Sequence, residues 1–105
     1  MTPHGGNGLT YRLSASGLDR QALPELLIRA AAAGIDADVI RAVKIICERL
    51  THDPLGFGEP LYQLPTGKLE VRLGAVPLLS VRYAVHQEQP LVILLAVTPL
   101  SGSGL

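Results

Sequence analysis

The order of its candidate segments is the feature that most constrains how this chain can fold. A short alternating segment at residues 9–15 comes first, two helix-like segments fill residues 18–50, and three strand-like segments fill residues 68–100. The order is therefore β-α-α-β-β-β. Two helices joined by a short connection form a hairpin, which must bury its apolar stripes on the sheet. The sequence predicts an α+β fold, with a two-helix hairpin packed on a four-stranded, mostly antiparallel sheet.

The second helical segment has the clearest periodicity. Its apolar residues recur every three or four positions and form one stripe, which consists of Val39, Ile40, Val43, Ile46, Cys47 and Leu50. We expect Asp36 to cap its N-terminus and Asp53-Pro54 to end it. Gly34, just before the cap, is expected to close the first helix in a left-handed conformation.

The strand-like segments differ in how their apolar residues are spaced. The first of the three alternates, and we expect its apolar residues to face the helices while Lys68, Glu70 and Arg72 face solvent; the apolar set is Leu69, Val71 and Leu73. Residues 91–97 are apolar on both faces, which is typical of an interior strand, so we place this strand inside the sheet beside the first one. Residues 53–67 are rich in Gly and Pro and are expected to form a turn-rich bridge.

Composition limits the classes of function. Nine basic residues balance nine acidic ones, and this zero net charge disfavours non-specific nucleic-acid binding. The single cysteine fits the reducing cytoplasm, and no apolar run approaches the about twenty residues that a membrane helix needs. We expect one cytoplasmic domain at residues 9–100, between a flexible leader at residues 1–8 and a flexible tail at residues 101–105. The histidines are too scattered for a metal site, and no cofactor is expected.

Four short motifs resemble the RelE/ParE-type toxins of bacterial toxin–antitoxin pairs. Residues 50–54 are similar to the Leu-x-x-Asp-Pro ending of that family's second helix, and residues 58–64 to its Gly-x-Pro-Leu-x-x-Leu bridge. Residues 71–74 are similar to its Leu-Arg-Val-Gly strand, and residues 81–85 to its Val-x-Tyr-x-Val strand. The order and spacing of the motifs extend the resemblance over residues 9–100.

This resemblance implies a small toxin that a cognate antitoxin holds in check. Some members of the family cleave messenger RNA on the ribosome and others poison DNA gyrase, and both targets remain open here. Cleavage needs cations where charge develops on the phosphate and a group that moves the 2′-hydroxyl proton. The residues implied to bind nucleic acid are Lys68, Arg72 and Arg82, and those implied to act in catalysis are Arg72, Arg82 and His86.

The chain also departs from the family's pattern. Ser80 stands where an arginine is common, residues 97–100 carry no charge where a basic residue is expected, and residues 75–78 lengthen a hairpin. The alternative function is therefore a non-catalytic interaction module, a homodimer or an antitoxin-binding protein, that kept the fold and lost the chemistry. On that interpretation the cations form an ordinary solvated face and His86 is a surface histidine.

A helix hairpin of this size can cover only one face of a four-stranded sheet. The two-sided apolarity of the last strand therefore predicts an apolar patch that the helices leave uncovered, and such patches mark partner surfaces. A second copy of the chain or an antitoxin segment is the expected occupant. The expected interface residues are Leu78, Val92, Leu94 and Ala96, or the strand neighbours of opposite parity.

Overall fold

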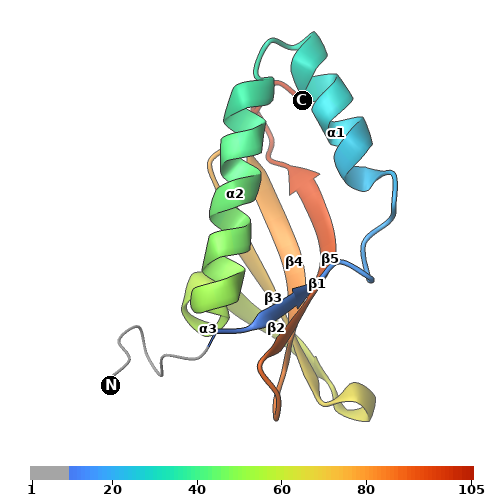
Figure 1. Ribbon diagram of the computed structural model, residues 1–105, viewed down its shortest axis with the longest axis vertical. Helices are drawn as coiled ribbons and strands as arrows, with labels where there is room; N and C mark the ends of the chain where they lie inside the picture. The colour runs from blue at the N-terminus through green and yellow to red at the C-terminus, as the bar shows by residue number, and fades with distance from the viewer. Residues whose placement is uncertain (1–9) are drawn as a thin grey trace.

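Figure 1 shows the computed structural model of the chain, of which residues 10–105 are described. In chain order the elements are β1 (Arg12–Ser14), α1 (Ala22–Ala32), α2 (Asp36–His52), α3 (Pro54–Phe57), β2 (Glu59–Leu64), a 3₁₀ turn (Pro65–Gly67), β3 (Leu69–Val76), β4 (Leu79–His86) and β5 (Leu91–Pro99). The expected leader, residues 1–8, lies outside the described residues.

The strands form one open, mixed sheet in the order β1-β5-β4-β3-β2. β1 runs parallel to β5, and the other neighbours are antiparallel. The α+β class is confirmed, and the last strand does lie inside the sheet beside the first. The predicted strand count was wrong, because residues 59–64 of the expected bridge form a fifth strand along β3. Pro60 and a bulge after it break the alternation that would have marked this strand.

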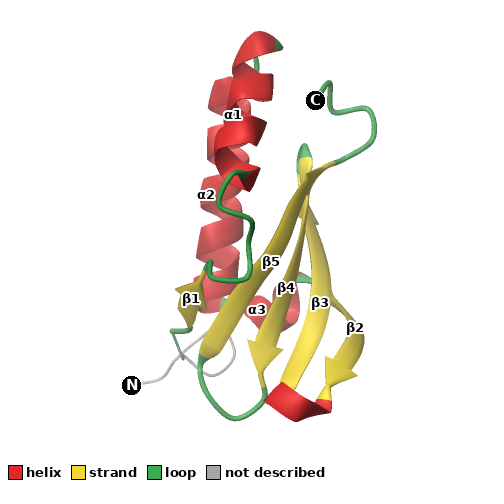
Figure 2. Cartoon of the chain, turned by 90° about the vertical axis from the view of Figure 1, so that its right-hand side faces the viewer, coloured by secondary structure: helices red, strands yellow, loops and turns green. Residues whose placement is uncertain are grey.

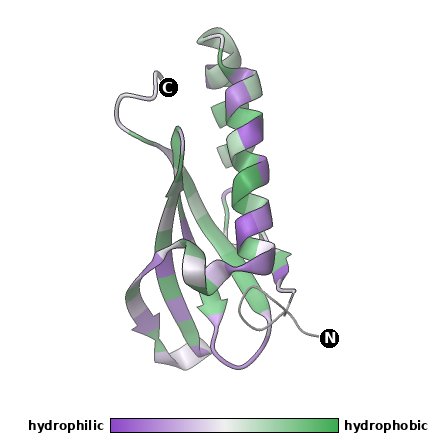
Figure 3. Ribbon diagram, turned by 90° about the vertical axis from the view of Figure 1, so that its left-hand side faces the viewer, coloured by the Kyte–Doolittle hydropathy of each residue, from purple (hydrophilic) through white to green (hydrophobic). Residues whose placement is uncertain are grey.

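All three helices lie on one face of the sheet, as Figure 2 shows from the side. α2 packs across β1, β3 and β4, while α1 packs against α2 and β5. The main core lies between these layers, and its buried members are Tyr11, Leu26, Ala30, Val39, Ala42, Ile46, Leu50, Val76, Leu79, Val81, Tyr83, Val85, Val92 and Leu94. Figure 3 shows how hydrophobic and hydrophilic residues alternate along α2, which gives it an apolar face for this core.

The helix ends follow the local sequence with one difference. Gly34 adopts a φ of 77° and closes α1, as predicted. α2 ends at His52, directly before Asp53-Pro54, but it begins at Asp36, so Ile35 and not Asp36 occupies the N-cap position. Asp36 instead lies in the first turn, where the helix dipole favours a negative charge.

We call the sheet face that the helices leave uncovered the open face. Residues directly paired on adjacent strands point to the same face, so the strand registers define its members. One row across the sheet consists of Ser14, Ile93, Ala84, Val71 and Tyr62. The next row consists of Ala96, Arg82, Leu73 and Glu59. Leu69, Val71 and Leu73 therefore face away from the helices, which reverses the predicted parity of β3.

Candidate functional site

Arg72 lies on the covered face of the sheet and is only 8% exposed. It pairs with Tyr83 across the β3–β4 ladder, so both side chains point toward the helices. Its Nη2 donates to the carbonyl oxygens of Leu55 at 2.8 Å and Gly58 at 2.7 Å, and its Nη1 donates to the Glu70 carboxylate. The guanidinium therefore ties α3 and the residue after it to β3, and the prediction that Arg72 lies on a solvated face was wrong.

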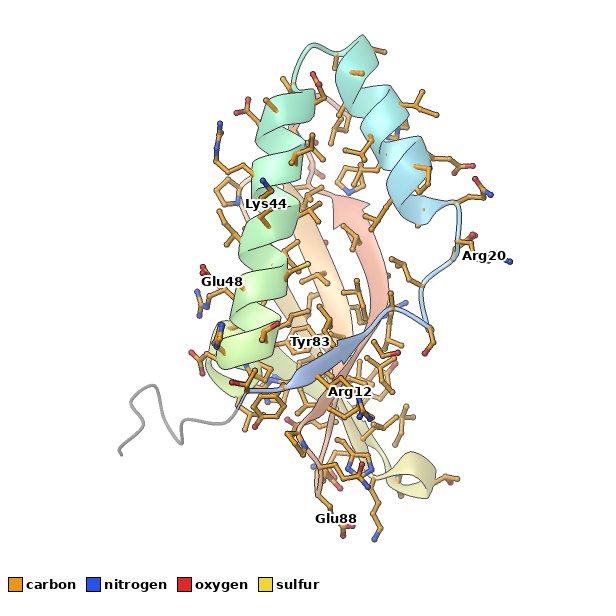
Figure 4. The ribbon with its side chains drawn as sticks, in the orientation of Figure 1. Arg12, Arg20, Lys44, Glu48, Tyr83 and Glu88 are labelled. Carbon is orange, nitrogen blue, oxygen red and sulfur yellow. The ribbon has the colours of Figure 1, made fainter. Side chains whose placement is uncertain are left out.

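Tyr83 completes this connection between α3 and the sheet. Its hydroxyl donates to the Pro54 carbonyl at 2.6 Å and accepts from the Gly58 N–H at 2.9 Å. The Phe57 ring stacks on the Tyr83 ring with their centroids 5.9 Å apart. The β3–β4 register places Tyr83 on the covered face, and Figure 4 labels it beside the lower part of α2. Burial raises the pKa of the Tyr83 hydroxyl, and the nearby Arg72 only partly opposes this effect.

Gly74 explains why β3 has the opposite parity to the one predicted. The Phe57 ring lies directly over Gly74, where a Cβ atom would come within 2.5 Å of a ring carbon. A residue with a side chain at this position would displace the ring, so glycine allows α3 to pack closely on the sheet. With Gly74 beneath Phe57, Arg72 must also face the helices, since both lie on the same side of the strand.

The three predicted nucleic-acid-binding residues do not form a cluster. Arg82 points to the open face, away from Arg72. Lys68 forms an exposed ion pair with Glu88 at the tip of the β4–β5 turn, at 2.9 Å. Arg82 is thus exposed on the open face, without the neighbours that a shared phosphate site would need.

His86 ends β4 and takes part in the following turn. Its Nδ1 accepts from the backbone N–H groups of Glu88 at 3.0 Å and Gln89 at 3.1 Å. We therefore assign the proton of the neutral imidazole to Nε2, which leaves the basic nitrogen engaged by the turn. Four residue steps along β4, or about 13 Å, separate the backbone of His86 from that of Arg82, its predicted catalytic partner.

The predicted interface residues are divided between the two faces. Val92 and Leu94 are buried in the core beneath the helices, so the prediction that they are uncovered was wrong. Ala96 lies on the open face, because a bulge at Leu95 shifts the alternation between Leu94 and Ala96. Leu78 lies in the β3–β4 turn with a φ of 80° and lines an open groove of about 330 Å³ beside α2.

The open face carries apolar residues of which sequence reasoning anticipated Ile93, an opposite-parity neighbour of Val92 and Leu94, but not those of β2 and β3. Val71 and Ala84 are fully buried although they lie outside the main core. Around them, Tyr62 is 51% exposed, Leu64 42% and Leu73 44%. We call this surface the open-face patch and define it by Tyr62, Leu64, Val71, Leu73, Ala84 and Ile93.

One signal in the sequence could have revealed this patch. Glycine inside a strand often marks a close approach of another part of the chain, so Gly74 pointed to a covered position. The alternating residues Leu73 and Val71 then belong to the opposite face. The alternation of Tyr62 and Leu64 was hidden by the bulge in β2.

The other described groups that could take part in chemistry do not form a second site. An open depression of about 330 Å³ lies between Tyr11, Leu55 and the β4–β5 turn, but its Glu70 carboxylate is paired with Arg72. Burial raises the pKa of the Cys47 thiol, which favours its protonated form. Residues 10–105 bring together no three His, Cys, Asp or Glu side chains that could hold a metal ion. In the same residues, no helix is both long and apolar enough to cross a membrane.

Comparisons with protein-family models, with curated proteins and with solved structures found no match to this chain.

Proposed function

We propose that this chain is the toxin-like component of a bacterial toxin–antitoxin pair and that its open-face patch binds a partner protein. The observation that carries the proposal is the half-exposed apolar surface that Tyr62, Leu64 and Leu73 form on the open face, opposite the helix layer. Each Å² of apolar surface left in water forgoes roughly 25 cal/mol of stabilisation. A partner that covers the half-exposed Tyr62, Leu64 and Leu73 would recover part of that free energy.

The toxin–antitoxin assignment itself is supported by the motifs and their order in the chain. Two of the motifs meet at α3. The helix-ending motif supplies Asp53-Pro54, where α3 begins, and the strand motif supplies Arg72 and Gly74, on which α3 packs. The arginine of the strand motif therefore has a structural role. A cytoplasmic antitoxin would be the partner, since the single cysteine fits that compartment.

We assign no cleavage step to the residues implied by the resemblance. Arg72 donates hydrogen bonds to two carbonyl oxygens and a carboxylate, and the Nδ1 atom of His86 accepts hydrogen bonds from two backbone N–H groups. A phosphate site needs cations that can approach the substrate, and Arg82 alone does not supply one. Protein binding is therefore the activity that the open face supports best.

Induced expression in a bacterial host tests the proposal. We expect the chain alone to slow growth, and co-expression with the small protein encoded beside its own gene to restore growth and yield a stoichiometric complex. A Leu73→Asp variant should lose that complex because it places charge in the apolar patch. An Arg20→Glu variant should keep it, since Arg20 lies in the exposed loop before α1 (Figure 4). Normal growth with abundant soluble protein and no complex would overturn the proposal.

A further inference from the structure

We propose that the open-face patch also forms a symmetric homodimer, in which a second copy of this chain packs sheet on sheet with β3 against β3. This inference shares with the proposed function the premise that the open face binds protein, and it names one partner and its register. The two-fold axis lies between the sheets and runs along β3. Such an axis brings β2 of each copy opposite β4 of the other at the same height.

The charges at one level of this interface are complementary. Glu59 and Arg82 both flank Leu73 in the strand register, Glu59 on β2 and Arg82 on β4. The proposed axis therefore places Glu59 opposite the partner's Arg82, and the symmetry repeats the pair. Both side chains are exposed, and neither takes part in an ion pair within residues 10–105.

The apolar side chains that a second copy can reach are Tyr62 and Leu73, which are half-exposed. Tyr62 on β2 and Ala84 on β4 flank Val71. Val71 and Ala84 are already covered within one chain, so the axis brings the half-exposed Tyr62 ring of each copy over the surface of β4 in the other, while the two Leu73 side chains meet across the axis. Packed sheets lie about 10 Å apart, which leaves room for two Leu73 side chains across the axis.

Pairing through the sheet edge is less suited to a second copy. β2 is an exposed edge strand, but Pro60 lacks the N–H that a new ladder would need. The bulge between Pro60 and Tyr62 further interrupts the edge. The face of β2, β3 and β4 therefore suits self-association better than the edge of β2.

Light scattering and sedimentation of the purified full chain test this register through a charge swap. We expect the native chain to be dimeric, and Arg82→Glu and Glu59→Arg each to weaken dimerisation by roughly tenfold or more, since each single change opposes like charges twice. The double variant Glu59→Arg/Arg82→Glu should restore the dimer. Arg20→Glu, a charge reversal outside the open face, should leave it unchanged.

Circular dichroism melting shows whether each variant is folded. If a single reversal does not fold, the neutral substitution at the same position, Glu59→Gln or Arg82→Gln, takes its place. A monomeric native chain at high concentration would overturn the inference. So would single reversals that stay fully dimeric, or a folded double variant that stays monomeric. A monomer that still slows growth and binds the antitoxin would remove only the homodimer. A charge-dependent dimer with normal growth and no complex would remove only the toxin–antitoxin assignment.

Discussion

The two faces of the sheet are built from the same strands but are stabilised in different ways. On the covered face, α2 and α3 bury apolar residues together with a hydrogen-bonded group around Arg72 and Tyr83. On the open face, no helix covers the sheet, yet Val71 is as fully buried as Leu79 on the covered face. Tyr62 and Leu73 lie beside Val71 on this face, and they remain half-exposed while Val71 is buried.

This difference teaches that burial alone does not identify the structural core. Removing a polar group from the covered face leaves partners unsatisfied in a desolvated site, while the same change on the open face leaves groups that water can reach. Matched substitutions should therefore lower the free energy of unfolding more on the covered face than on the open face. The difference between the two losses shows how much more the protein depends on the covered face.

The largest contrast is expected for an acid introduced on each face. Leu79→Asp buries an unpaired charge beneath the helices, which costs several kcal/mol and approaches the roughly 5–15 kcal/mol stability of a typical domain. Leu73→Asp puts the same group at a position that is 44% exposed. We expect Leu79→Asp to be unfolded by circular dichroism and Leu73→Asp to be folded. Similar melting of the two variants would contradict the assignment of faces.

The next contrast compares two arginines. Arg72→Ala leaves Glu70 and the carbonyl oxygens of Leu55 and Gly58 without their donor, and we expect the free energy of unfolding to fall by about 3 kcal/mol. At a protein concentration low enough for the chain to be monomeric, Arg82→Ala should change it by less than about 0.5 kcal/mol, as exposed substitutions usually do. Urea denaturation measures both. Equal midpoints would mean that Arg72 does not fasten α3.

A smaller contrast compares two tyrosines. Tyr83→Phe removes the hydroxyl that bonds Pro54 and Gly58, and it should lower the free energy of unfolding by about 2 kcal/mol. Tyr62→Phe removes a hydroxyl from a half-exposed ring on the open face and should be nearly neutral. A loss in Tyr62→Phe that matched the loss in Tyr83→Phe, measured by urea denaturation, would be evidence against a polar network restricted to the covered face.

The smallest effect is expected at alkaline pH. Because burial raises the folded-state pKa of Tyr83, the unfolded state loses this proton first, near the ordinary tyrosine pKa of about 10. Stability from Tyr83 is thus fully present below that pH and falls as the pH rises toward the folded-state pKa. Urea denaturation at a series of pH values should show the advantage of native protein over Tyr83→Phe shrinking in this window. A constant advantage would contradict the raised pKa.

Sequence reasoning predicted the fold class but not the arrangement of the candidate site. The residues implied to bind phosphate share one face only if β3 has the parity suggested by its apolar residues. That parity was reversed, so Arg72 and Arg82 point in opposite directions. The interface prediction treated Val92, Leu94 and Ala96 as one face, and the bulge at Leu95 separates them. The expected uncovered face exists, but it is centred on β3 and β4.

The sequence by itself determined the order of the elements, the helix endings at Gly34 and Asp53-Pro54, and the apolar stripe of α2 apart from Ile40, which is 42% exposed. These features depend on residues close together in the chain, so local preferences suffice. Only the tertiary structure decided which side of each strand meets the helices. A period of two says that side chains alternate, but it does not say which set is covered. That choice was made by contacts between distant residues, with Phe57 packed on Gly74 and Arg72 bonded to the carbonyl oxygens around α3.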